Sequence, residues 1–276
     1  MPTELPDRSV DVESSEEDYV KKQFALLLYR LRRLDSLRGR TQGALVQTLL
    51  DELLTVDTPK GAVSFVTMGK TAAGRMATIL TKQPGTIAWI DNFVPNSVFW
   101  DVGANVGVFT LYAGLRRDTR IVAIEPAAVN YFTLAANCEA NGLGDVADCL
   151  LVGLGRTRQL GRLDVSQFSG AQSFKFTDGE RHPGRQAALV LPLDTLIEDF
   201  DLPCPNYIKI DVPAMTEAII EGGARTWQRP EVRSIHVEAS DESSTGRRIL
   251  ASLAQYGFTV VSRSEHGSRD LTLERR

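Results

Sequence analysis

The segment from Asp101 to Gly107, which reads Asp-Val-Gly-Ala-Asn-Val-Gly, places the strongest constraint on what this chain can fold into. It follows the short apolar run Val98-Phe99-Trp100 and precedes a stretch with helical spacing over residues 106–115. Gly103 lets the backbone turn sharply and approach a ligand, and Gly107 lets the following helix pack close to the strand. The segment therefore predicts a strand, a tight turn and a helix at the start of a cofactor-binding α/β domain.

The rest of the chain repeats this alternation of apolar runs and helical patterns. Strands are predicted at residues 63–68, 98–100, 121–124, 147–152, 188–192, 207–210 and 234–237, with a closing pair at 259–261 and 271–273, and helices at 71–81, 106–115, 130–141, 216–222 and 247–256. We interpret Pro84-Gly85 as a turn. This rhythm predicts a doubly wound, Rossmann-like α/β sheet that is mostly parallel and has an antiparallel closing strand.

Three regions divide the chain. Residues 1–16 are acidic and polar, which predicts a flexible tail. Residues 17–60 contain two amphipathic runs and are expected to form an N-terminal helical extension, and residues 61–276 form the catalytic domain. A helical layer packed on the core is the favoured role for the extension. The alternative is a lid, a partner-binding surface or an arm that joins copies of the chain into a homo-oligomer.

Composition excludes several classes of function. The net charge of -4 gives no basic excess for neutralising phosphates, so a nucleic-acid partner is not expected. The three cysteines lack the spacing of a disulfide framework or a zinc site, and no metal site is predicted. The first apolar run, residues 24–29, is far shorter than the ~18 residues of a membrane span, and the start lacks a secretory signal. We therefore expect a cytoplasmic protein without a membrane span.

Charge at the glycine turn selects between cofactors. A carboxylate at Asp101 suits a cationic amino or sulfonium group better than a dinucleotide pyrophosphate. Glu125 follows the apolar strand 121–124, where a carboxylate can accept the hydroxyls of a ribose. S-adenosylmethionine is thus favoured over a nicotinamide, which would make the chain an NAD-dependent oxidoreductase. The predicted cofactor-binding residues are Asp101, Gly103, Ala104, Asn105, Gly107, Glu125 and Pro126.

Several separate motifs, in their order along the chain, resemble the FkbM-type methyltransferases. They are residues 84–90, 98–110, Glu125-Pro126, Asn137, Asn141-Gly142-Leu143, residues 191–196 and residues 207–212, and the resemblance covers about residues 60–275. It implies transfer of a methyl group from S-adenosylmethionine to a hydroxyl of a glycan, sugar or secondary metabolite.

Polar residues at two further strand ends are candidates for the chemistry. Asp211 ends the strand 207–210, Lys209 projects to the same face, and Glu238 ends the next strand. We expect Asp211 to act as the base or to orient the acceptor hydroxyl, with Lys209 and Glu238 setting its charge environment. The alternative is a buried ion network with a purely structural role. For His236, on the face of the second strand, a structural role is favoured.

One segment departs from the pattern of the resembled family. That pattern continues after Asp-Val with Glu-Gly and a second glutamate two residues further on, whereas this chain reads Asp211-Val212-Pro213-Ala214-Met215-Thr216-Glu217. A second hypothesis follows: the protein is a catalytically altered relative that binds the cofactor and serves a protein partner.

The polar stretch 164–184 is either a lid over the acceptor, with Phe168, Phe174 and Phe176 as its apolar contacts, or a loose insertion.

Overall fold

The computed structural model describes residues 53–66, 83–164, 175–176, 185–240, 242–263 and 270–275. All of them belong to one compact unit, Leu53–Arg276. The predicted acidic tail, the expected helices between residues 17 and 52, the helix at 71–81 and most of the proposed lid, including Phe168 and Phe174, lie outside the described residues.

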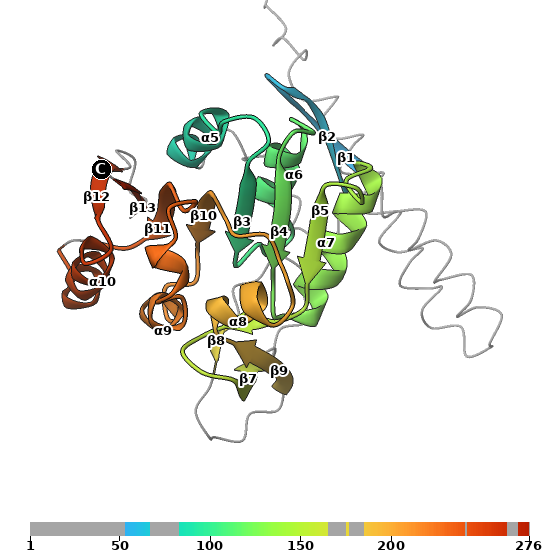
Figure 1. Cartoon of the computed structure of the whole chain (residues 1–276). Helices are drawn as coiled ribbons and strands as arrows, with labels where there is room; N and C mark the ends of the chain where they lie inside the picture. The colour runs from blue at the N-terminus through green and yellow to red at the C-terminus, as the bar shows by residue number, and fades with distance from the viewer. Residues whose placement is uncertain are drawn as a thin grey trace, which may run out of the picture. The chain divides into compact units, whose positions relative to one another are not determined.

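A seven-stranded sheet forms the centre of this unit (Figure 1). In spatial order its strands are β12 (Phe258–Arg263), β13 (Asp270–Arg275), β11 (Ser234–Glu238), β10 (Tyr207–Ile210), β3 (Val98–Val102), β4 (Arg120–Ile124) and β5 (Ala147–Leu150). Only β13 pairs antiparallel with its neighbours, as the sequence predicted. The strand order reverses between β3 and β10, and in such sheets ligands bind beyond the carboxyl ends of the strands at that point.

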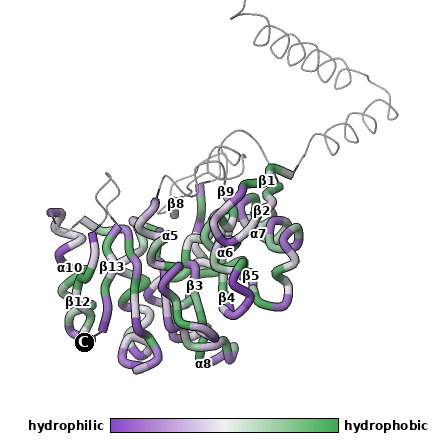
Figure 2. The backbone as a smooth tube through the Cα atoms, turned by 90° about the horizontal axis from the view of Figure 1, so that it is seen from above, coloured by the Kyte–Doolittle hydropathy of each residue, from purple (hydrophilic) through white to green (hydrophobic). Residues whose placement is uncertain are grey.

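Helices cover both faces of the sheet because its strands are apolar on both sides. On one face lie α5 (Pro84–Asp91), α6 (Val108–Gly114) and α7 (Ala128–Ala140), packed against Phe99 and Ile121. On the other lie α8 (Leu193–Glu198), α9 (Thr216–Gly222), the 3₁₀ helix Thr226–Gln228 and α10 (Ser244–Ala254), packed against Trp100, Val122 and Ile208. Hydrophobic residues run along the central strands between the two layers (Figure 2). The predicted doubly wound fold is confirmed.

Two local expectations were wrong. Pro84-Gly85 is not a turn but the first turn of α5, where proline is tolerated because its missing N–H would have no helical partner. The polar stretch after β5 is partly ordered, since β6 (Gly153–Leu154), β7 (Gln159–Asp164), β8 (Lys175–Phe176) and β9 (Arg185–Leu191) form a second sheet in the order β6-β9-β7-β8. The short helix α8 was also not anticipated.

A hairpin precedes the main sheet. Its strands β1 (Leu53–Thr58) and β2 (Gly61–Val66) pair antiparallel, so the end of the range 17–60 is a strand and not the expected helix. The alternating Leu, Val and Thr residues of β1 suit a pleated surface better than a helix. Two side chains of α7 hold β2: Asn137 Oδ1 accepts from Val66 N at 2.6 Å, and Asn141 Oδ1 accepts from Ser64 N at 2.9 Å.

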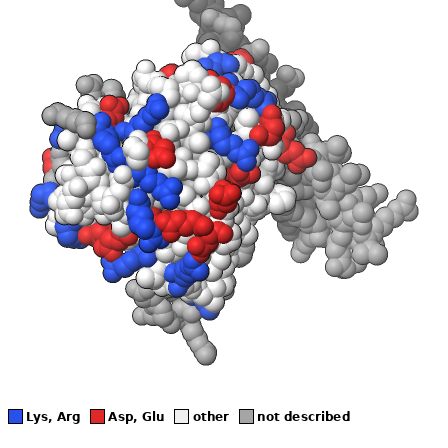
Figure 3. Space-filling view, viewed as in Figure 1, with Lys and Arg blue, Asp and Glu red and all other residues white. Residues whose placement is uncertain are grey.

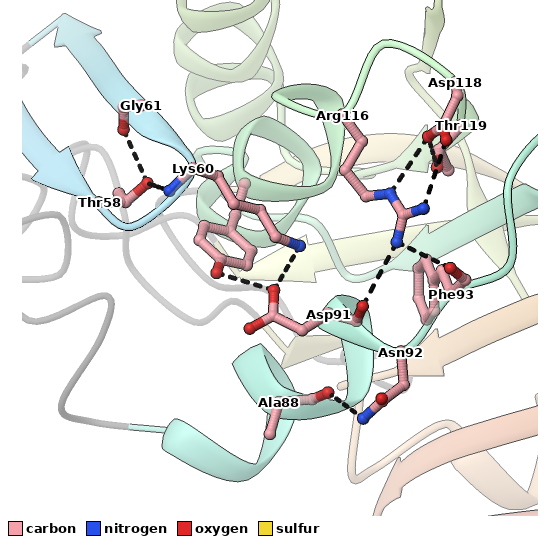
Figure 4. A network of polar contacts seen from close by, with 11 residues as sticks. Thr58, Lys60, Gly61, Ala88, Asp91, Asn92, Phe93, Arg116, Asp118 and Thr119 are labelled. Carbon is pink, nitrogen blue, oxygen red and sulfur yellow. Dashed lines mark hydrogen bonds and ion pairs between the residues drawn. The ribbon is translucent and has the colours of Figure 1, made fainter.

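A polar network joins this hairpin to α5 and α6 (Figure 4). Lys60, in the hairpin turn, forms an ion pair with Asp91 at the end of α5, and Tyr112 Oη of α6 donates to the same carboxylate at 2.9 Å. Arg116 donates to the carbonyl of Phe93 at 2.7 Å. These contacts connect the hairpin, α5 and α6, the helix that follows the glycine turn.

Charged side chains of both signs lie side by side on the face shown in Figure 3, without a large basic patch among its described residues. Three exposed ion pairs join neighbouring elements: Arg225 with Glu198, Arg248 with Glu217, and Arg156 with Glu221. In the part of the chain that the structure describes, no helix has the length and apolar character needed to cross a membrane.

Candidate active site

The glycine turn lies at the carboxyl end of β3, where its backbone is crowded. Gly103 has φ +80°, and a Cβ there would lie 2.7 Å from the carbonyl oxygen of Asp211. Gly107 has φ +89°, and its Cβ would lie 2.6 Å from a methyl group of Leu134. Both positions therefore need glycine for conformation and for space. The amides of Gly103 and Ala104 donate to the carbonyl of Ile124, which ties the turn to β4.

Glu125 directly follows β4 and joins the turn to α7. One carboxylate oxygen accepts from the amide of Asn105 and the other from the amide of Ala127, each at 2.9 Å. The residue is 6% exposed, and burial raises the pKa of its carboxyl to about 7 despite these bonds. Since a carboxylate offers about four acceptor positions, Glu125 can hold the turn and still accept ligand hydroxyls.

Asp101 is fully buried beneath the turn. Its Oδ2 accepts from the hydroxyl of Thr110 on α6 at 2.8 Å, whereas its Oδ1 has no hydrogen-bond partner among the described residues. Burial raises the pKa of this carboxyl, and the nearby Lys209 ammonium opposes the rise. An unpaired buried carboxylate oxygen favours a cationic or donor group, which is the electrostatic property predicted for Asp101.

A row of polar residues crosses the sheet next to Asp101. Asp101, Lys209 and His236 are aligned in register on β3, β10 and β11. Lys209 is 2% exposed, with its ammonium 2.8 Å from Asp211 Oδ2 and 4.7 Å from the ring centroid of Phe109. Burial acts to lower the pKa of Lys209, but the two carboxylates Asp211 and Asp101 outweigh it and raise the pKa. Lys209 therefore stays charged between two acids.

Asp211 and Glu238 meet at the carboxyl ends of β10 and β11. Burial, a shared hydrogen bond with Asp211 and the negative charge of Asp211 together raise the pKa of Glu238 to about 7. Asp270, the first residue of β13 and the register partner of Glu238, adds a third negative group. The structure thus brings together the three residues predicted for catalysis, Lys209, Asp211 and Glu238, and it adds Asp270, which the sequence analysis missed.

A cavity of about 340 Å³ opens beside Glu238. It lies between the segment after β10 and the start of α10, and its lining combines carboxylate, hydroxyl and apolar groups. The lining residues are Pro213, Ala214, Glu238, Ala239, Ser240, Ser243, Thr245, Gly246 and Ile249. A volume of this order fits a small organic ligand or one ring of a larger one.

His236 is structural, as the sequence favoured. Its Nε2 lies 2.9 Å from the hydroxyl of Thr86 and its Nδ1 lies 3.0 Å from that of Thr272. The ring stacks on Trp89 at a centroid distance of 5.0 Å. Burial lowers its pKa to about 3, so the imidazole is neutral, and both of its nitrogens are already engaged.

The segment that departs from the family pattern leaves its missing carboxylates unreplaced. Pro213 lies in the turn before α9, where the amide of Met215 donates to the carbonyl of Val212 at 2.8 Å, and not in the first turn of the helix. Glu217 forms an ion pair with Arg248 at 2.6 Å on the outside of α9 and α10. Within the described residues, no three His, Cys, Asp or Glu side chains are grouped so as to hold a metal ion.

Fold and site together define a Rossmann-like methyltransferase. Its defining features are the strand order, the antiparallel β13, the buried acid beneath the glycine turn and the acid that ends β4. The sequence matches the model of the methyltransferase FkbM domain over residues 101–260, and the chain therefore belongs to the FkbM methyltransferase family. This membership decides for a methyltransferase over the nicotinamide-dependent oxidoreductase.

Among characterised relatives, the chain is 24% identical over 198 residues to the 31-O-demethyl-FK506 methyltransferase FkbM of Streptomyces tacrolimicus, covering 62% of this chain and 76% of the relative. Solved structures with a similar fold include a precorrin-6y C5,15-methyltransferase from Geobacter metallireducens GS-15, with 15% identity, a TM-score of 0.43 and coverage of 71% of this chain and 88% of that one. Another is the magnesium protoporphyrin IX methyltransferase from Synechocystis PCC 6803, which was solved with bound S-adenosylmethionine. It has 13% identity and a TM-score of 0.44, and the match covers 74% of this chain and 81% of that one.

The cofactor is S-adenosylmethionine, as the sequence predicted, and the described residues fit it. The unpartnered buried oxygen of Asp101 would suit a cationic group of the cofactor. The carboxylate of Glu125, at the neighbouring strand end, would suit ribose hydroxyls. The backbone at Gly103 and Gly107 adopts the turn that brings these groups together.

Proposed function

We propose that this protein is an O-methyltransferase that acts on a hydroxyl of a glycan, a sugar or a secondary metabolite. The observation that carries the proposal is the acid pair Asp211 and Glu238: the two share a hydrogen bond, Asp211 pairs with the buried ammonium of Lys209, and Glu238 lines a 340 Å³ cavity. A hydroxyl is weakly acidic, so its methylation is aided by a nearby carboxylate that can take the proton.

The cofactor site we propose consists of Asp101, Gly103, Ala104, Asn105, Gly107, Glu125 and Pro126, the residues predicted from the sequence. When bound, S-adenosylmethionine supplies the methyl group. The backbone amide of Asn105 and the carboxylate of Glu125 are already linked, so the turn is held in place before a ligand arrives. Such preorganisation reduces the entropy lost on binding.

In the proposed reaction the acceptor hydroxyl lies against the acid pair and passes its proton to a carboxylate oxygen of Asp211 or Glu238. Lys209 favours the ionised form of Asp211 through the 2.8 Å ion pair. The pKa of Glu238, raised to about 7, places the exchange of its proton near neutral pH. The hydroxyls of Ser240, Ser243 and Thr245 in the cavity lining suit a hydroxylated acceptor. The relative from Streptomyces tacrolimicus, which by its name methylates an oxygen of a secondary metabolite, supports the same class of acceptor.

A second candidate is a catalytically altered relative that binds the cofactor without turnover. It is favoured by one observation: Glu217 is paired with Arg248 and does not fill the place of the missing carboxylates. The expected helices before residue 53 would then serve a protein partner or a second copy of the chain.

Methyl-labelled S-adenosylmethionine and a panel of sugars, glycosides and hydroxylated macrolides test the two candidates. We expect label in at least one hydroxylated acceptor.

In the reaction with that acceptor, Glu238→Gln should lower turnover about 100-fold, the lower end of general acid–base contributions, with little change in cofactor affinity. Asp211→Asn should act in the same direction, and Glu217→Gln, on the outside of α9, is the matched control. Cofactor binding without labelling of any acceptor would favour the altered relative, and normal turnover of both site variants would remove the acid pair from the mechanism.

A further inference from the structure

Two cysteines lie together at the other end of the sheet from the acid pair. Cys138 on α7 and Cys149 on β5 have their sulfur atoms 3.6 Å apart, within the range of a thiol hydrogen bond. Both are free thiols, and Cys138 is buried whereas Cys149 is partly exposed. Their spacing in the sequence matches no disulfide framework or zinc site, and the fold brings the two cysteines together from positions eleven residues apart.

Solvent reaches this pair. Cys138 and Cys149 both line a cavity of about 610 Å³ between α7 and β5, together with Tyr131, Ala135, Glu139, Gly142, Gly144, Asp145, Ala147 and Asp148. Two of the acidic residues in this lining are already paired, Asp148 with Arg120 at 2.5 Å and Asp145 with Arg117 at 3.5 Å. Their charge is therefore partly neutralised, and the thiols are the chemically reactive groups of the cavity.

The environment distinguishes the two thiols. The hydrogen bond between the two sulfur atoms lowers the pKa of Cys149, although burial and the charge of Asp148 act against this. The same hydrogen bond and burial raise the pKa of Cys138. Because the thiolate is the nucleophilic form of cysteine, Cys149 is the attacking residue and Cys138 is the neighbour placed to respond.

We propose that Cys138 and Cys149 form a dithiol site that hydrogen peroxide oxidises to an intramolecular disulfide. The thiolate of Cys149 attacks one peroxide oxygen, the O–O bond breaks, and the leaving hydroxide takes a proton to become water, which gives a sulfenic acid on Cys149. The sulfur of Cys138 then attacks the sulfur of Cys149, the S–S bond forms, and the sulfenic hydroxyl leaves with the proton of Cys138 as a second water. Two thiols lose two electrons and the peroxide gains them.

The product links the C-terminal part of α7 to β5, two elements that are also connected to Glu125. Closing the gap from 3.6 Å to a disulfide bond of about 2.05 Å requires a small approach of helix and strand. The helix begins directly after Glu125, Pro126 and Ala127, and the amide of Glu125 donates to the carbonyl of Leu150 at the end of β5. The proposal concerns thiols outside the acid pair and does not depend on the proposed methyl transfer.

The chain offers its own internal reference, since its sequence contains only one further cysteine, Cys204. Burial raises the pKa of the Cys204 thiol to about 11, so it should react slowly. The reduced protein is treated with increasing hydrogen peroxide, its remaining thiols are alkylated, and the products are weighed by mass spectrometry. Cleavage after Glu139 separates Cys138 from Cys149 and reveals whether a disulfide joins them.

We expect the wild type and the control variant Cys204→Ser to lose two alkylatable thiols together, roughly tenfold faster than Cys204 reacts in the wild type. In Cys138→Ser the sulfenic acid on Cys149 has no partner and should be captured by dimedone, whereas Cys149→Ser should give much less capture. The proposal is overturned if Cys138 and Cys149 stay alkylatable when Cys204 has reacted, or if the disulfides form only between chains. The wild-type measurement is sufficient even if a serine variant fails to fold.

Discussion

Glu125 serves the fold and, in the proposed function, also binds the cofactor. Its two carboxylate oxygens hold the glycine turn through Asn105 and the start of α7 through Ala127. Burial raises the pKa of this carboxyl to about 7, so its charge changes near neutral pH. A ribose hydroxyl donates more strongly to an ionised carboxylate than to a carboxylic acid.

We therefore expect the affinity for S-adenosylhomocysteine to fall as the pH decreases through about 7, because Glu125 gains a proton. Glu125→Gln should weaken binding about tenfold, the loss of one hydrogen bond to a charged group, and should flatten the pH dependence. Calorimetric titrations on both sides of this pKa measure both effects. Glu139→Gln, at an exposed position of α7, is the matched control, and unchanged affinity in Glu125→Gln would remove the ribose role.

Much of the site could be predicted from individual residues, because strand ends of a parallel sheet meet at one edge. Asp101, Glu125, Lys209, Asp211 and Glu238 follow apolar runs, and the structure brings them to that edge. Thr110 and Asp270 were missed, since a helix hydroxyl and the first residue of an antiparallel strand carry no comparable signal. The pairing of Cys138 with Cys149 depends on how α7 packs on β5, which no local pattern specifies.

At the level of elements, Asn137 connects three segments. Its Oδ1 accepts from Val66 of β2, and its Nδ2 donates to the carbonyl of Val106 in the glycine turn at 2.7 Å. The side chain is fully buried, so both bonds are made without competition from water. Asn137 is one of the positions that resemble the FkbM family. Its role in this structure is to dock the hairpin β1–β2 on α7 and to support the glycine turn.

Asn137→Ala should leave the amide of Val66 and the carbonyl of Val106 unsatisfied, at a cost of about 1–3 kcal/mol for each group that stays buried. We expect faster amide hydrogen exchange in β2 and a lower urea midpoint. Asn92→Ala, which removes an exposed bond to the carbonyl of Ala88, is the control and should change stability by about 1 kcal/mol or less. Exchange in β2 at the wild-type rate would contradict the docking role.

The elements that the sequence predicted correctly are those with a simple pattern. The strands β10 and β4 and the helix α9 match their predicted ranges to within a residue, because each is an apolar run or helical repeat between clear breaks. Of the second sheet, the sequence predicted only β9, as the strand 188–192. The other strands were missed because they are short or half polar: in β7, Leu160 faces outward while Leu163 is buried. Pairing between distant segments, and not local propensity, decides such strands.

For the molecule as a whole, His236 and the two acids Glu125 and Glu238 make stability depend on pH in two opposite directions. The pKa of His236 is lowered from 6.5 to about 3, so the unfolded chain gains a proton below pH 6.5 that the folded chain refuses, and stability is lost as the pH falls from 6.5 towards 3. The pKa values of Glu125 and Glu238 are raised from 4.5 to about 7. Their contributions are fully present below pH 4.5 and are lost as the pH rises through 7.

Because these contributions oppose one another between pH 4.5 and 6.5, the wild-type curve alone does not isolate His236, and a variant is needed. His236→Gln can bond to Thr86 or Thr272 but does not titrate. Below pH 6.5 the wild type should lose free energy of unfolding relative to this variant, by up to about 1.4 kcal/mol per pH unit. Urea unfolding at a series of pH values measures the difference. Glu238→Gln should change the pH dependence of the free energy of unfolding in the opposite sense. If the free energy of unfolding changes with pH in the same way in the wild type and in His236→Gln, the imidazole is protonated in the folded state. The two threonine partners of the ring and the nearby Lys209 ammonium argue against this outcome.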